Sequence, residues 1–318
     1  MTIPILVIGY NRPEFIRRRL LELSESNSIP DKVIISLDGS GQQQFILPPP
    51  DWAIDEIFLE SLPFDLNIIR RSENLGCSKH IILAVSEVLA EYRSCIIIED
   101  DVVIGKSFVD AMKRGFLIME LSEKLGIVGG FSPFYRSLFP FLRGNSWRLS
   151  PYFSAWGWGA TSELWEKFVS FSDIASIEEE LSHSQFWIKL SKRKQKIWLE
   201  RFDRGVWDYN VQYILFLNSL RVLLPTFRLI DNEGFSDLRS THTKLKRPWN
   251  LFGEGYCQIG PDDLKWISNG FPSKLFWSFV DSNLWAADGY FNARARKVGV
   301  RSFLKQMLRS FRRIMARV

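Results

Sequence analysis

Short apolar segments alternate with longer segments of helical periodicity over the first 130 residues. The apolar segments, which predict strands, are Ile3–Ile8, Val33–Leu37, Leu66–Ile69, Cys95–Ile98 and Gly126–Gly129. The helices expected between them are Pro13–Leu23, Ser78–Tyr92 and Ser107–Leu121. Strands that alternate with helices are typical of a mostly parallel sheet with helices on its faces. The pattern therefore predicts an α/β fold.

The pattern changes after Phe131, where shorter segments are rich in aromatic residues. A Trp-Gly-Trp sequence at 156–158 leads into an expected helix, with Thr161 or Ser162 as its cap. A second apolar helix is expected over Val211–Leu217, and a short strand should follow it. The chain thus has one region of regular strand–helix alternation and one region built around aromatic side chains.

Polar side chains follow four of the predicted strands directly. They are Asn11 and Arg12 after the first strand, Asp38 after the second, Arg71 after the third, and Glu99, Asp100 and Asp101 after the fourth. If the strands are parallel, all four sets meet at one edge of the sheet, where α/β proteins bind ligands. A rim with both cationic and anionic members indicates a nucleotide site, although loop polarity explains any one set alone. The chain has no dinucleotide-binding glycine motif and no phosphate loop, which disfavours an NAD enzyme or an ATPase.

Three consecutive carboxylates, Glu99, Asp100 and Asp101, end the fourth predicted strand. Such a cluster is electrostatically costly unless a cation or a proton neutralises it. Carboxylate oxygens suit Mg²⁺ or Mn²⁺, which commonly bridge a carboxylate to phosphate oxygens. The cluster therefore indicates a metal–diphosphate site, with an acidic loop or a helix N-cap as the alternative.

The composition narrows the class of protein. Of 318 residues, 46% are hydrophobic and 24% are charged, as in ordinary soluble globular proteins. The three cysteines, Cys77, Cys95 and Cys257, lack the spacing of a disulfide framework or a cysteine zinc site. The N-terminal segment does not resemble a signal peptide, and no apolar stretch reaches membrane-spanning length. We therefore expect a cytoplasmic protein.

Positive charge is concentrated at the C-terminal end. Residues 294–318 contain nine Lys and Arg and no Asp or Glu, so the rest of the chain carries a net charge of −4 against +5 overall. Apolar residues recur there at helical spacing, and a basic amphipathic helix of this kind binds anionic membrane surfaces. We expect peripheral association with the inner face of a membrane; a helix docked on the protein's own core is the alternative. Nucleic acid is not an expected partner, because the positive charge is confined to this one segment.

The ordered set of these segments resembles glycosyltransferases of the GT-A fold. The resemblance is carried by Ile3–Ile8, Glu99-Asp100-Asp101, Gly157-Trp158, Glu163-Leu164-Trp165, Trp207-Asp208 and His242. It covers about residues 3–243 and is greatest to N-acetylglucosaminyltransferase I and to bacterial surface-polysaccharide transferases with a Trp-Gly-Trp segment. Tyr10 and Asn11 depart from the family's pattern, and segments 130–150 and beyond Lys244 match nothing in it.

The resemblance implies a fold and a division of the chain. The fold would be α/β, with a GT-A, Rossmann-like and mostly parallel sheet flanked by helices. Residues 1–130 would form the half that binds a nucleotide-sugar, and 131–243 the acceptor and catalytic half. Residues 244–318 would be an extension that ends in the basic amphipathic helix.

The resemblance also implies roles for the residues of the strand-end rim. Asp101 would bind Mn²⁺ or Mg²⁺, Asp100 the donor ribose or sugar, and Glu99 the sugar. Asp38 would hydrogen-bond the base or ribose. The remaining donor-binding candidates are Asn11, Arg71 for uracil or phosphate, Arg12 as a weaker candidate for the same role, and His80 for the nucleotide. For His80, packing on a helix face is the alternative.

Asp208 is the candidate general base. The family has Trp-Asp at the matching place, and a positioned carboxylate that takes the acceptor proton typically contributes about 10²–10⁴ in rate. The alternative is a helix N-cap, because Asp208 begins a helical pattern. His242 would contact the metal or the diphosphate, or fix a loop. Trp156 and Trp158 would stack on acceptor sugars, or else belong to the core.

Together these inferences predict a metal-dependent, inverting hexosyltransferase. It would transfer a sugar such as GlcNAc from a UDP-sugar to a glycan or lipid-linked acceptor in surface polysaccharide biosynthesis. One alternative is a sugar-nucleotidyltransferase, although the expected glycine-rich basic loop is absent around Tyr10–Arg12. The other alternative is a binding module that does not catalyse a reaction.

Overall fold

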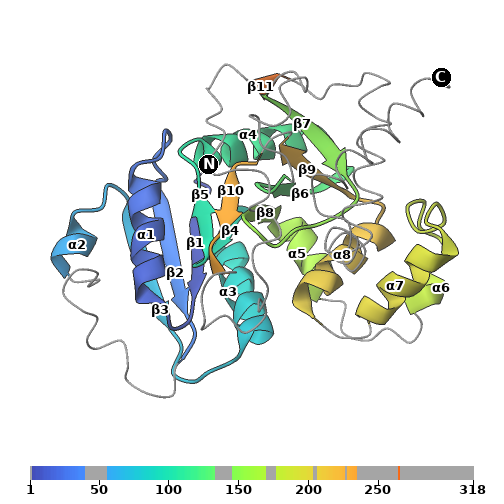
Figure 1. Cartoon of the computed structure of the whole chain (residues 1–318), viewed down its shortest axis with the longest axis horizontal. Helices are drawn as coiled ribbons and strands as arrows, with labels where there is room; N and C mark the ends of the chain where they lie inside the picture. Colours follow the sequence, from blue (N-terminus) through green and yellow to red (C-terminus); the bar gives the residue numbers. More distant parts are fainter. Residues whose placement is uncertain are drawn as a thin grey trace, which may run out of the picture.

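A nine-stranded, mainly parallel sheet forms the centre of the computed structural model (Figure 1). The structure describes residues 2–39, 56–132, 145–169, 177–202, 206–225, 228–234 and 264–265. The sheet has the order β11-β7-β9-β6-β8-β4-β1-β2-β3. Its strands are β1 (Ile5–Gly9), β2 (Lys32–Leu37), β3 (Asp65–Arg70), β4 (Ser94–Glu99), β6 (Leu125–Gly129), β7 (Asn145–Ser150), β8 (Trp158–Thr161), β9 (Arg221–Pro225) and β11 (Leu264–Lys265). A separate antiparallel pair joins β5 (Val102–Ile104) to β10 (Ile230–Asn232).

The predicted parallel strands are confirmed. Strands β3, β2, β1 and β4 are neighbours in this order and run parallel to one another. Each of the five strands and three helices predicted in the first 130 residues lies within two residues of its observed bounds. Strand β8, which starts at Trp158, runs antiparallel between β4 and β6 and joins the two regions of the chain into one sheet.

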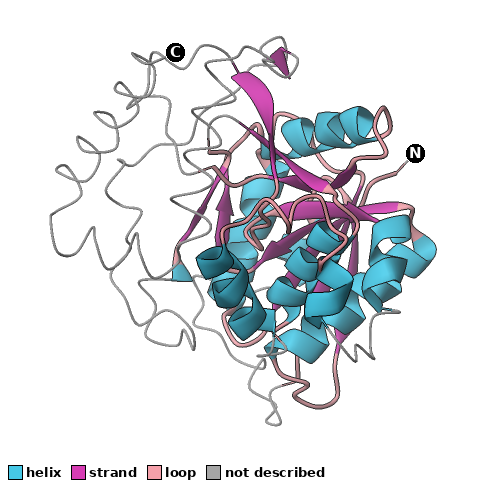
Figure 2. Ribbon diagram, turned by 90° about the vertical axis from the view of Figure 1, so that its right-hand side faces the viewer, coloured by secondary structure: helices cyan, strands magenta, loops and turns pink. Residues whose placement is uncertain are grey.

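Helices cover both faces of the sheet (Figure 2). They are α1 (Pro13–Ser24), α2 (Glu56–Glu60), α3 (Cys77–Glu91), α4 (Phe108–Met119), α5 (Ser162–Val169), α6 (Ile177–Leu181), α7 (Lys192–Phe202) and α8 (Trp207–Leu217). Successive residues of a strand point to opposite faces. In β1, Ile5 and Val7 therefore pack with α1, α2 and α4, whereas Leu6 and Ile8 pack with α3 and α5–α8.

These two apolar layers explain the sequence pattern and the α/β fold that it predicted. The central parallel strands β1 and β4 are buried on both faces and therefore read as continuous apolar runs. Helix α1 begins at Pro13, where a missing N–H costs no hydrogen bond, and it buries Ile16, Leu20 and Leu23. Thr161 caps α5 as expected, because its Oγ1 accepts a hydrogen bond from the Leu164 N–H at 3.4 Å.

The C-terminal segment lies almost entirely outside the described residues. Of the predicted extension 244–318, only β11 is described, and the basic segment 294–318 and His242 are not. None of the helices within the described ranges is both long enough and apolar enough to cross a membrane.

Candidate functional site

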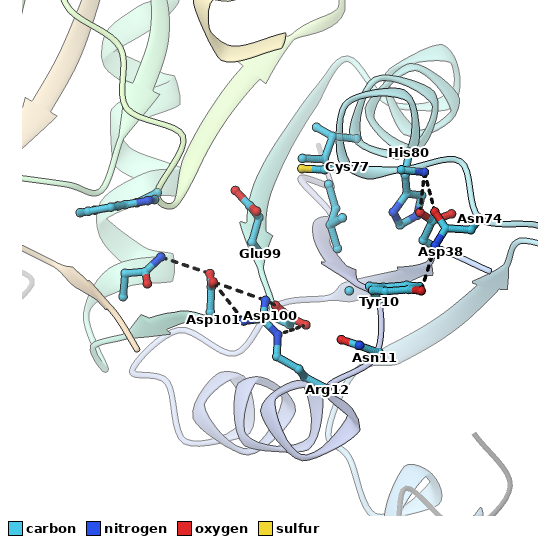
Figure 3. A pocket seen from close by; sticks show the side chains of 16 residues that line it. Tyr10, Asn11, Arg12, Asp38, Asn74, Cys77, His80, Glu99, Asp100 and Asp101 are labelled. Atoms are coloured by element: carbon cyan, nitrogen blue, oxygen red, sulfur yellow. Dashed lines mark hydrogen bonds and ion pairs between the residues drawn. The ribbon is translucent and has the colours of Figure 1, made fainter. Parts of the chain in front are cut away.

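A pocket of about 510 Å³ opens at the carboxyl ends of β1, β2 and β4 (Figure 3). The parallel pairing continues one residue past the strands: the Asp38 N–H donates to the Gly9 carbonyl at 3.0 Å, and the Asp100 N–H donates to the Ile8 carbonyl at 2.9 Å. The strand-end side chains are therefore fixed at one rim. The polar and aromatic side chains that line it are Tyr10, Asn11, Arg12, Asp38, Asn74, Cys77, His80, Glu99, Asp100, Asp101, Trp156 and Asn232.

Glu99, Asp100 and Asp101 form the acidic wall of this pocket. Burial raises the pKa of Glu99 well above its usual range, and the nearby charges of Asp101 and Asp100 add to the increase. Burial also raises the pKa of Asp100, to about 7, and raises that of Asp101. Each carboxylate thus loses hydration that the protein only partly replaces, so the wall has a deficit of positive charge.

Within the described part of the chain, Arg12 is the cation that contacts this wall directly, and the charge of Arg19 also lowers the pKa of Asp100 and Asp101. Its Nε donates to Asp100 Oδ2 at 3.1 Å, its Nη2 contacts Asp100 Oδ1, and its Nη1 lies 3.3 Å from Asp101 Oδ2. The guanidinium opposes the burial effect on the pKa of both carboxyls. Arg12, expected from the sequence to contact uracil or phosphate, therefore lies on the carboxylates in this structure.

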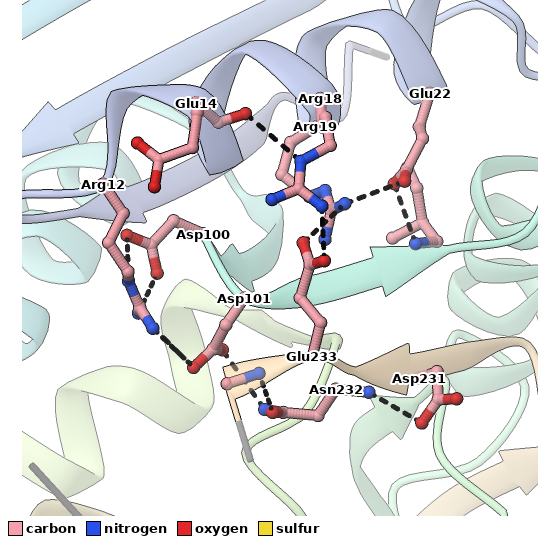
Figure 4. A network of polar contacts seen from close by, with 12 residues as sticks. Arg12, Glu14, Arg18, Arg19, Glu22, Asp100, Asp101, Asp231, Asn232 and Glu233 are labelled. Atoms are coloured by element: carbon pink, nitrogen blue, oxygen red, sulfur yellow. Dashed lines mark hydrogen bonds and ion pairs between the residues drawn. The ribbon is translucent and has the colours of Figure 1, made fainter. Parts of the chain in front are cut away.

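Asn232 is a pocket residue that the sequence analysis did not identify. Its Nδ2 donates to Asp101 Oδ1 at 3.2 Å, across 131 positions of sequence. The antiparallel pairing of β10 with β5 places Asn232 opposite Val102, directly after Asp101 (Figure 4). The only signal in the sequence was a polar turn after a short apolar segment, which does not reveal its partner strand.

Asp38 both lines the pocket and shapes its edge. Its Oδ1 accepts the N–H groups of Gly39 and Leu75 at 3.0 and 2.8 Å, and its Oδ2 accepts that of Gly76 at 3.0 Å. The carboxylate therefore fixes the turn that leads into α3. Tyr10 is fixed by the same turn, because Asn74 Nδ2 donates to its hydroxyl at 2.9 Å.

Helix α3 contributes Cys77, His80 and Ile81 to the pocket, of which the first two are polar. His80 is 3% exposed, and its Nε2 lies 2.8 Å from Ser36 Oγ. Burial lowers the pKa of His80, which favours the neutral ring. Cys77 is the first residue of the helix and was not identified as a site residue. Burial and nearby carboxylates raise its thiol pKa to about 12, so the thiol stays protonated and unreactive at neutral pH.

Asn11 and Arg71 are the two remaining donor-binding candidates, and they lie in different places. Asn11 lines the pocket. Arg71 is not among the lining residues; its guanidinium binds Glu87 on α3 through contacts of 2.8 and 2.5 Å.

The two tryptophans of the Trp-Gly-Trp sequence are separated by Gly157, which has a φ of +58° that L side chains rarely adopt. Trp156 lines the pocket and meets the Phe131 ring edge-on at 5.0 Å. Trp158 is 1% exposed and stacks on Trp207 at 5.7 Å. Of the two roles expected for Trp158, acceptor stacking or core packing, its burial supports the second.

Asp208 is the second residue of α8 and is half-buried. Its charge raises the pKa of Cys77 and Glu99, which places it on the acidic side of the pocket. Val206 occupies the N-cap position, yet Asp208 Oδ1 accepts the Tyr209 N–H at 3.0 Å. The carboxylate thus stabilises the first turn of the helix close to the acidic wall, although Asp208 is not one of the residues that line the pocket.

The acidic wall has the donor atoms for a divalent metal but not a complete set of ligands. Within the described residues, no group of three or more His, Cys, Asp or Glu side chains could hold a metal ion. Mg²⁺ is usually held by one or two carboxylates together with substrate phosphates, and such a site needs no cage made by the protein alone. The raised pKa of Asp101 and its position at the pocket wall fit a metal that arrives with a diphosphate.

A scan against protein-family models finds no match, and a search of curated proteins finds none either. Among solved structures, the mannosyltransferase PcManGT from Pyrobaculum calidifontis, in complex with GDP-Man and Mn²⁺, has 17% identity and a TM-score of 0.36, over 52% of this chain and 46% of that one. TarS 1–349 from S. aureus, in complex with UDP-GlcNAc, has 13% identity and a TM-score of 0.42, over 72% and 57%.

A third similar structure is glucosyl-3-phosphoglycerate synthase from Mycobacterium tuberculosis, in complex with Mn²⁺, UDP and glucosyl-3-phosphoglycerate. It has 16% identity and a TM-score of 0.32, over 51% of this chain and 57% of that one. The present chain thus spans about half the length of these proteins. Similarity at this level assigns no activity, donor or metal to this chain.

Proposed function

We propose that this chain is a glycosyltransferase of the GT-A fold that transfers a hexose from a nucleotide-sugar. The observation that carries the proposal is that one pocket is lined both by the acidic wall, Glu99 to Asp101, and by the buried Asp38 and His80. Open α/β sheets bind ligands at the carboxyl ends of their strands. Here the acidic wall suits a diphosphate with its metal, and the less acidic side of the pocket suits a nucleoside.

The nucleoside would occupy the side of the pocket formed by Asp38, His80 and Tyr10. Three backbone N–H groups already bind the Asp38 carboxylate, two of them at Oδ1, which leaves Oδ2 to accept a hydrogen bond from a base or ribose. Burial lowers the pKa of His80, and the neutral ring that this favours can both donate and accept a hydrogen bond. A UDP-sugar, with GlcNAc as the sugar, is the donor that we propose.

Asp101 would hold Mn²⁺ or Mg²⁺ together with the donor phosphates, and Glu99 and Asp100 would bind the sugar and ribose. When bound, the metal supplies Lewis-acid stabilisation of the charge that develops on the departing diphosphate. Arg12, which contacts both aspartates, holds them in place before the donor arrives and lies where it can contact a phosphate oxygen. His242, outside the described residues, is proposed to contact the diphosphate or the metal.

Asp208 would take the proton of the acceptor hydroxyl in an inverting transfer. The first turn of α8 positions it, and the buried stack of Trp207 on Trp158 anchors that turn. The aromatic neighbours exclude water and so favour proton transfer from the acceptor over competing hydrolysis. Trp156, at the pocket wall, is the proposed platform for the acceptor sugar.

We further propose a glycan or lipid-linked acceptor and a role in surface polysaccharide biosynthesis. The support is the basic amphipathic pattern of 294–318, which would hold the protein at the cytoplasmic face of a membrane where lipid-linked acceptors lie. Pelleting with anionic liposomes tests this part: deletion of 294–318 should abolish it, and unchanged pelleting would contradict it.

A thermal-shift panel of UDP-, GDP-, CMP- and dTDP-sugars, each with Mn²⁺ or with EDTA, tests the donor site. A ligand at 100 times its Kd adds about 2.7 kcal/mol to the free energy of unfolding, which shifts the Tm measurably. A metal-dependent shift with a UDP-sugar supports the proposal. No shift with any nucleotide-sugar in a folded sample would refute it.

A further inference from the structure

We propose that Arg19 and Glu233, neither of which lines the pocket, are positioning residues that fix the Asp101 carboxylate for the metal. This inference rests on the proposed function, because it concerns the same site. It assigns a role to a network that lies on the opposite side of Asp101 from Arg12 and Asp100 (Figure 4).

The first step of the network ties helix α1 to the paired strands β5 and β10. Arg19 is 1% exposed, and its Nη2 lies 2.8 Å from Glu22 Oε1 and 3.2 Å from Glu233 Oε1. Glu22 Oε2 in turn accepts the Ile104 N–H of β5 at 3.0 Å. Arg18 of the same helix also contacts Glu233, because its Nη1 donates to Glu233 Oε2 at 2.6 Å. Two guanidinium groups, the buried one of Arg19 and the more exposed one of Arg18, therefore join α1 to the residue that follows β10, and Arg19 also joins α1 to β5 through Glu22.

The second step joins that residue to Asp101. The Glu233 N–H donates to the Asp101 carbonyl at 2.9 Å, and Asn232 Nδ2 donates to Asp101 Oδ1 at 3.2 Å. Asn232 Oδ1 accepts the Gly234 N–H at 2.9 Å, which closes the turn on itself. The turn therefore contacts the backbone and the side chain of Asp101 at once.

Gly234 shows how tightly this turn lies against the carboxylate. A Cβ at position 234 would lie 2.2 Å from Asp101 Oδ2, which no real packing allows. Asp101 is thus held between Arg12 on one side and the 232–234 turn on the other. A shift of the turn would move the oxygen atoms that are to bind the metal.

The cost of burying Arg19 supports a positioning role. Its Nε and Nη1 are buried and have no hydrogen-bond partner among the described residues. A buried ion pair of this kind contributes little net stability compared with apolar packing, and it is best explained by the geometry it specifies. Here that geometry is the placement of Glu233, and through it the placement of Asp101.

The expected loss of Mn²⁺ affinity can be estimated from groups that orient metal ligands in other proteins. Their loss typically costs about 10–100-fold in metal affinity or activity. We expect Glu233→Gln to raise the Kd for Mn²⁺ about tenfold, because the amide keeps the shape of the side chain but loses the charge that pairs with Arg18 and Arg19. Affinity for UDP without metal should not change, since Glu233 does not line the pocket.

The test is a Mn²⁺ titration in the presence of UDP, followed by the electron paramagnetic resonance signal of free Mn²⁺. It compares the full-length wild type with Glu233→Gln and with Asp110→Asn, a control that removes a carboxylate charge from the remote Arg114 pair on α4. Circular dichroism and Tm confirm that each variant is folded. A weaker Mn²⁺ affinity in Glu233→Gln alone supports the inference, and equal affinities in all three proteins overturn it.

Two Arg19 variants sharpen the result. Arg19→Lys keeps a cation but presents a single ammonium group to Glu22 and Glu233, so its Mn²⁺ affinity should lie between those of wild type and Arg19→Met. Equal losses in Lys and Met variants that remain folded would show that the charge does not matter and would contradict the positioning role. If folded wild type binds UDP but no Mn²⁺, the metal role of Asp101 fails and this inference falls with it, whereas donor binding stands.

Discussion

The acidic rim at the ends of β1, β2 and β4 and the aromatic region around β8 and α8 contribute to the same site in opposite ways. Three carboxylates at the rim carry raised pKa values, and Arg12 offsets only part of their burial. The aromatic region buries Trp158, Trp165 and Trp207 in mutual contact. The carboxylates of the rim therefore lower the stability of the folded protein, whereas the packed aromatic region raises it and holds Asp208 in place.

The largest expected effect comes from Asp208→Asn, at the point where the two regions meet. We expect a loss of about 10²–10⁴ in the rate of sugar transfer, because the amide cannot accept the acceptor proton. The Asn oxygen can still accept the Tyr209 N–H, so Tm and UDP affinity should stay near wild type. Steady-state kinetics with a Tm measurement check this, and near-full activity would leave Asp208 with only its hydrogen bond in the first turn of α8.

Next in size is Trp158→Ala, which tests whether the aromatic region supplies stability. Removing this fully buried ring should lower the free energy of unfolding by about 3–5 kcal/mol. Urea denaturation measures the change. A loss below about 1 kcal/mol would show that the stack on Trp207 supports little, and the contrast between the two regions would fail.

The acidic rim, in contrast, should lower the stability of the folded protein as the pH rises. Because the Asp100 pKa is raised from 3.8 to about 7, the folded protein keeps a proton that the unfolded chain has lost between those values. Because the folded state binds more protons than the unfolded state between pH 3.8 and about 7, the free energy of unfolding is greatest at the acidic end of this range and decreases as the pH rises toward 7. Without metal, Asp100→Asn should reduce this fall by on the order of 1 kcal/mol.

Urea unfolding in EDTA at several pH values between 4 and 8 follows that change. Glu22, whose pKa burial also raises to about 7, contributes a similar slope in both proteins and serves as the internal reference. An identical pH dependence in wild type and variant would mean that Asp100 is ionised throughout and that the rim costs no stability.

The smallest effect on stability is expected for Trp156→Ala. Trp156 lines the pocket and is only partly buried, so the change should cost about 1 kcal/mol. Its effect should appear instead as a higher KM for the acceptor, with donor affinity unchanged. A stability loss as large as that of Trp158→Ala would place both tryptophans in the core.

The sequence predicted the first half of the fold closely because the information there is local. The apolar strands and amphipathic helices up to residue 130 were expected nearly at their observed bounds, and three of the four sets of polar residues expected at the strand ends line the pocket. What it could not show were contacts over long sequence separations. Arg12 meets Asp100 across 88 positions, and Asn232 meets Asp101 across 131.

The sequence also could not show that two residues of the same type have different roles. Nothing in the Trp-Gly-Trp pattern distinguishes Trp156 from Trp158; the positive φ of Gly157 sends one ring to the pocket and starts a buried strand with the other. Arg71 follows its strand as Asp38 does, yet it pairs with Glu87 because α3 places a carboxylate within its reach.

Calorimetric titration of UDP into wild type and Asp101→Asn, each with Mn²⁺ and with EDTA, tests the metal–diphosphate site most directly. Wild type should bind UDP at least about tenfold more tightly with Mn²⁺, a difference of about 1.4 kcal/mol, and Asp101→Asn should lose that gain while keeping the affinity measured in EDTA. The same Mn²⁺-dependent gain in both proteins, or no binding of UDP by folded wild type, would contradict it.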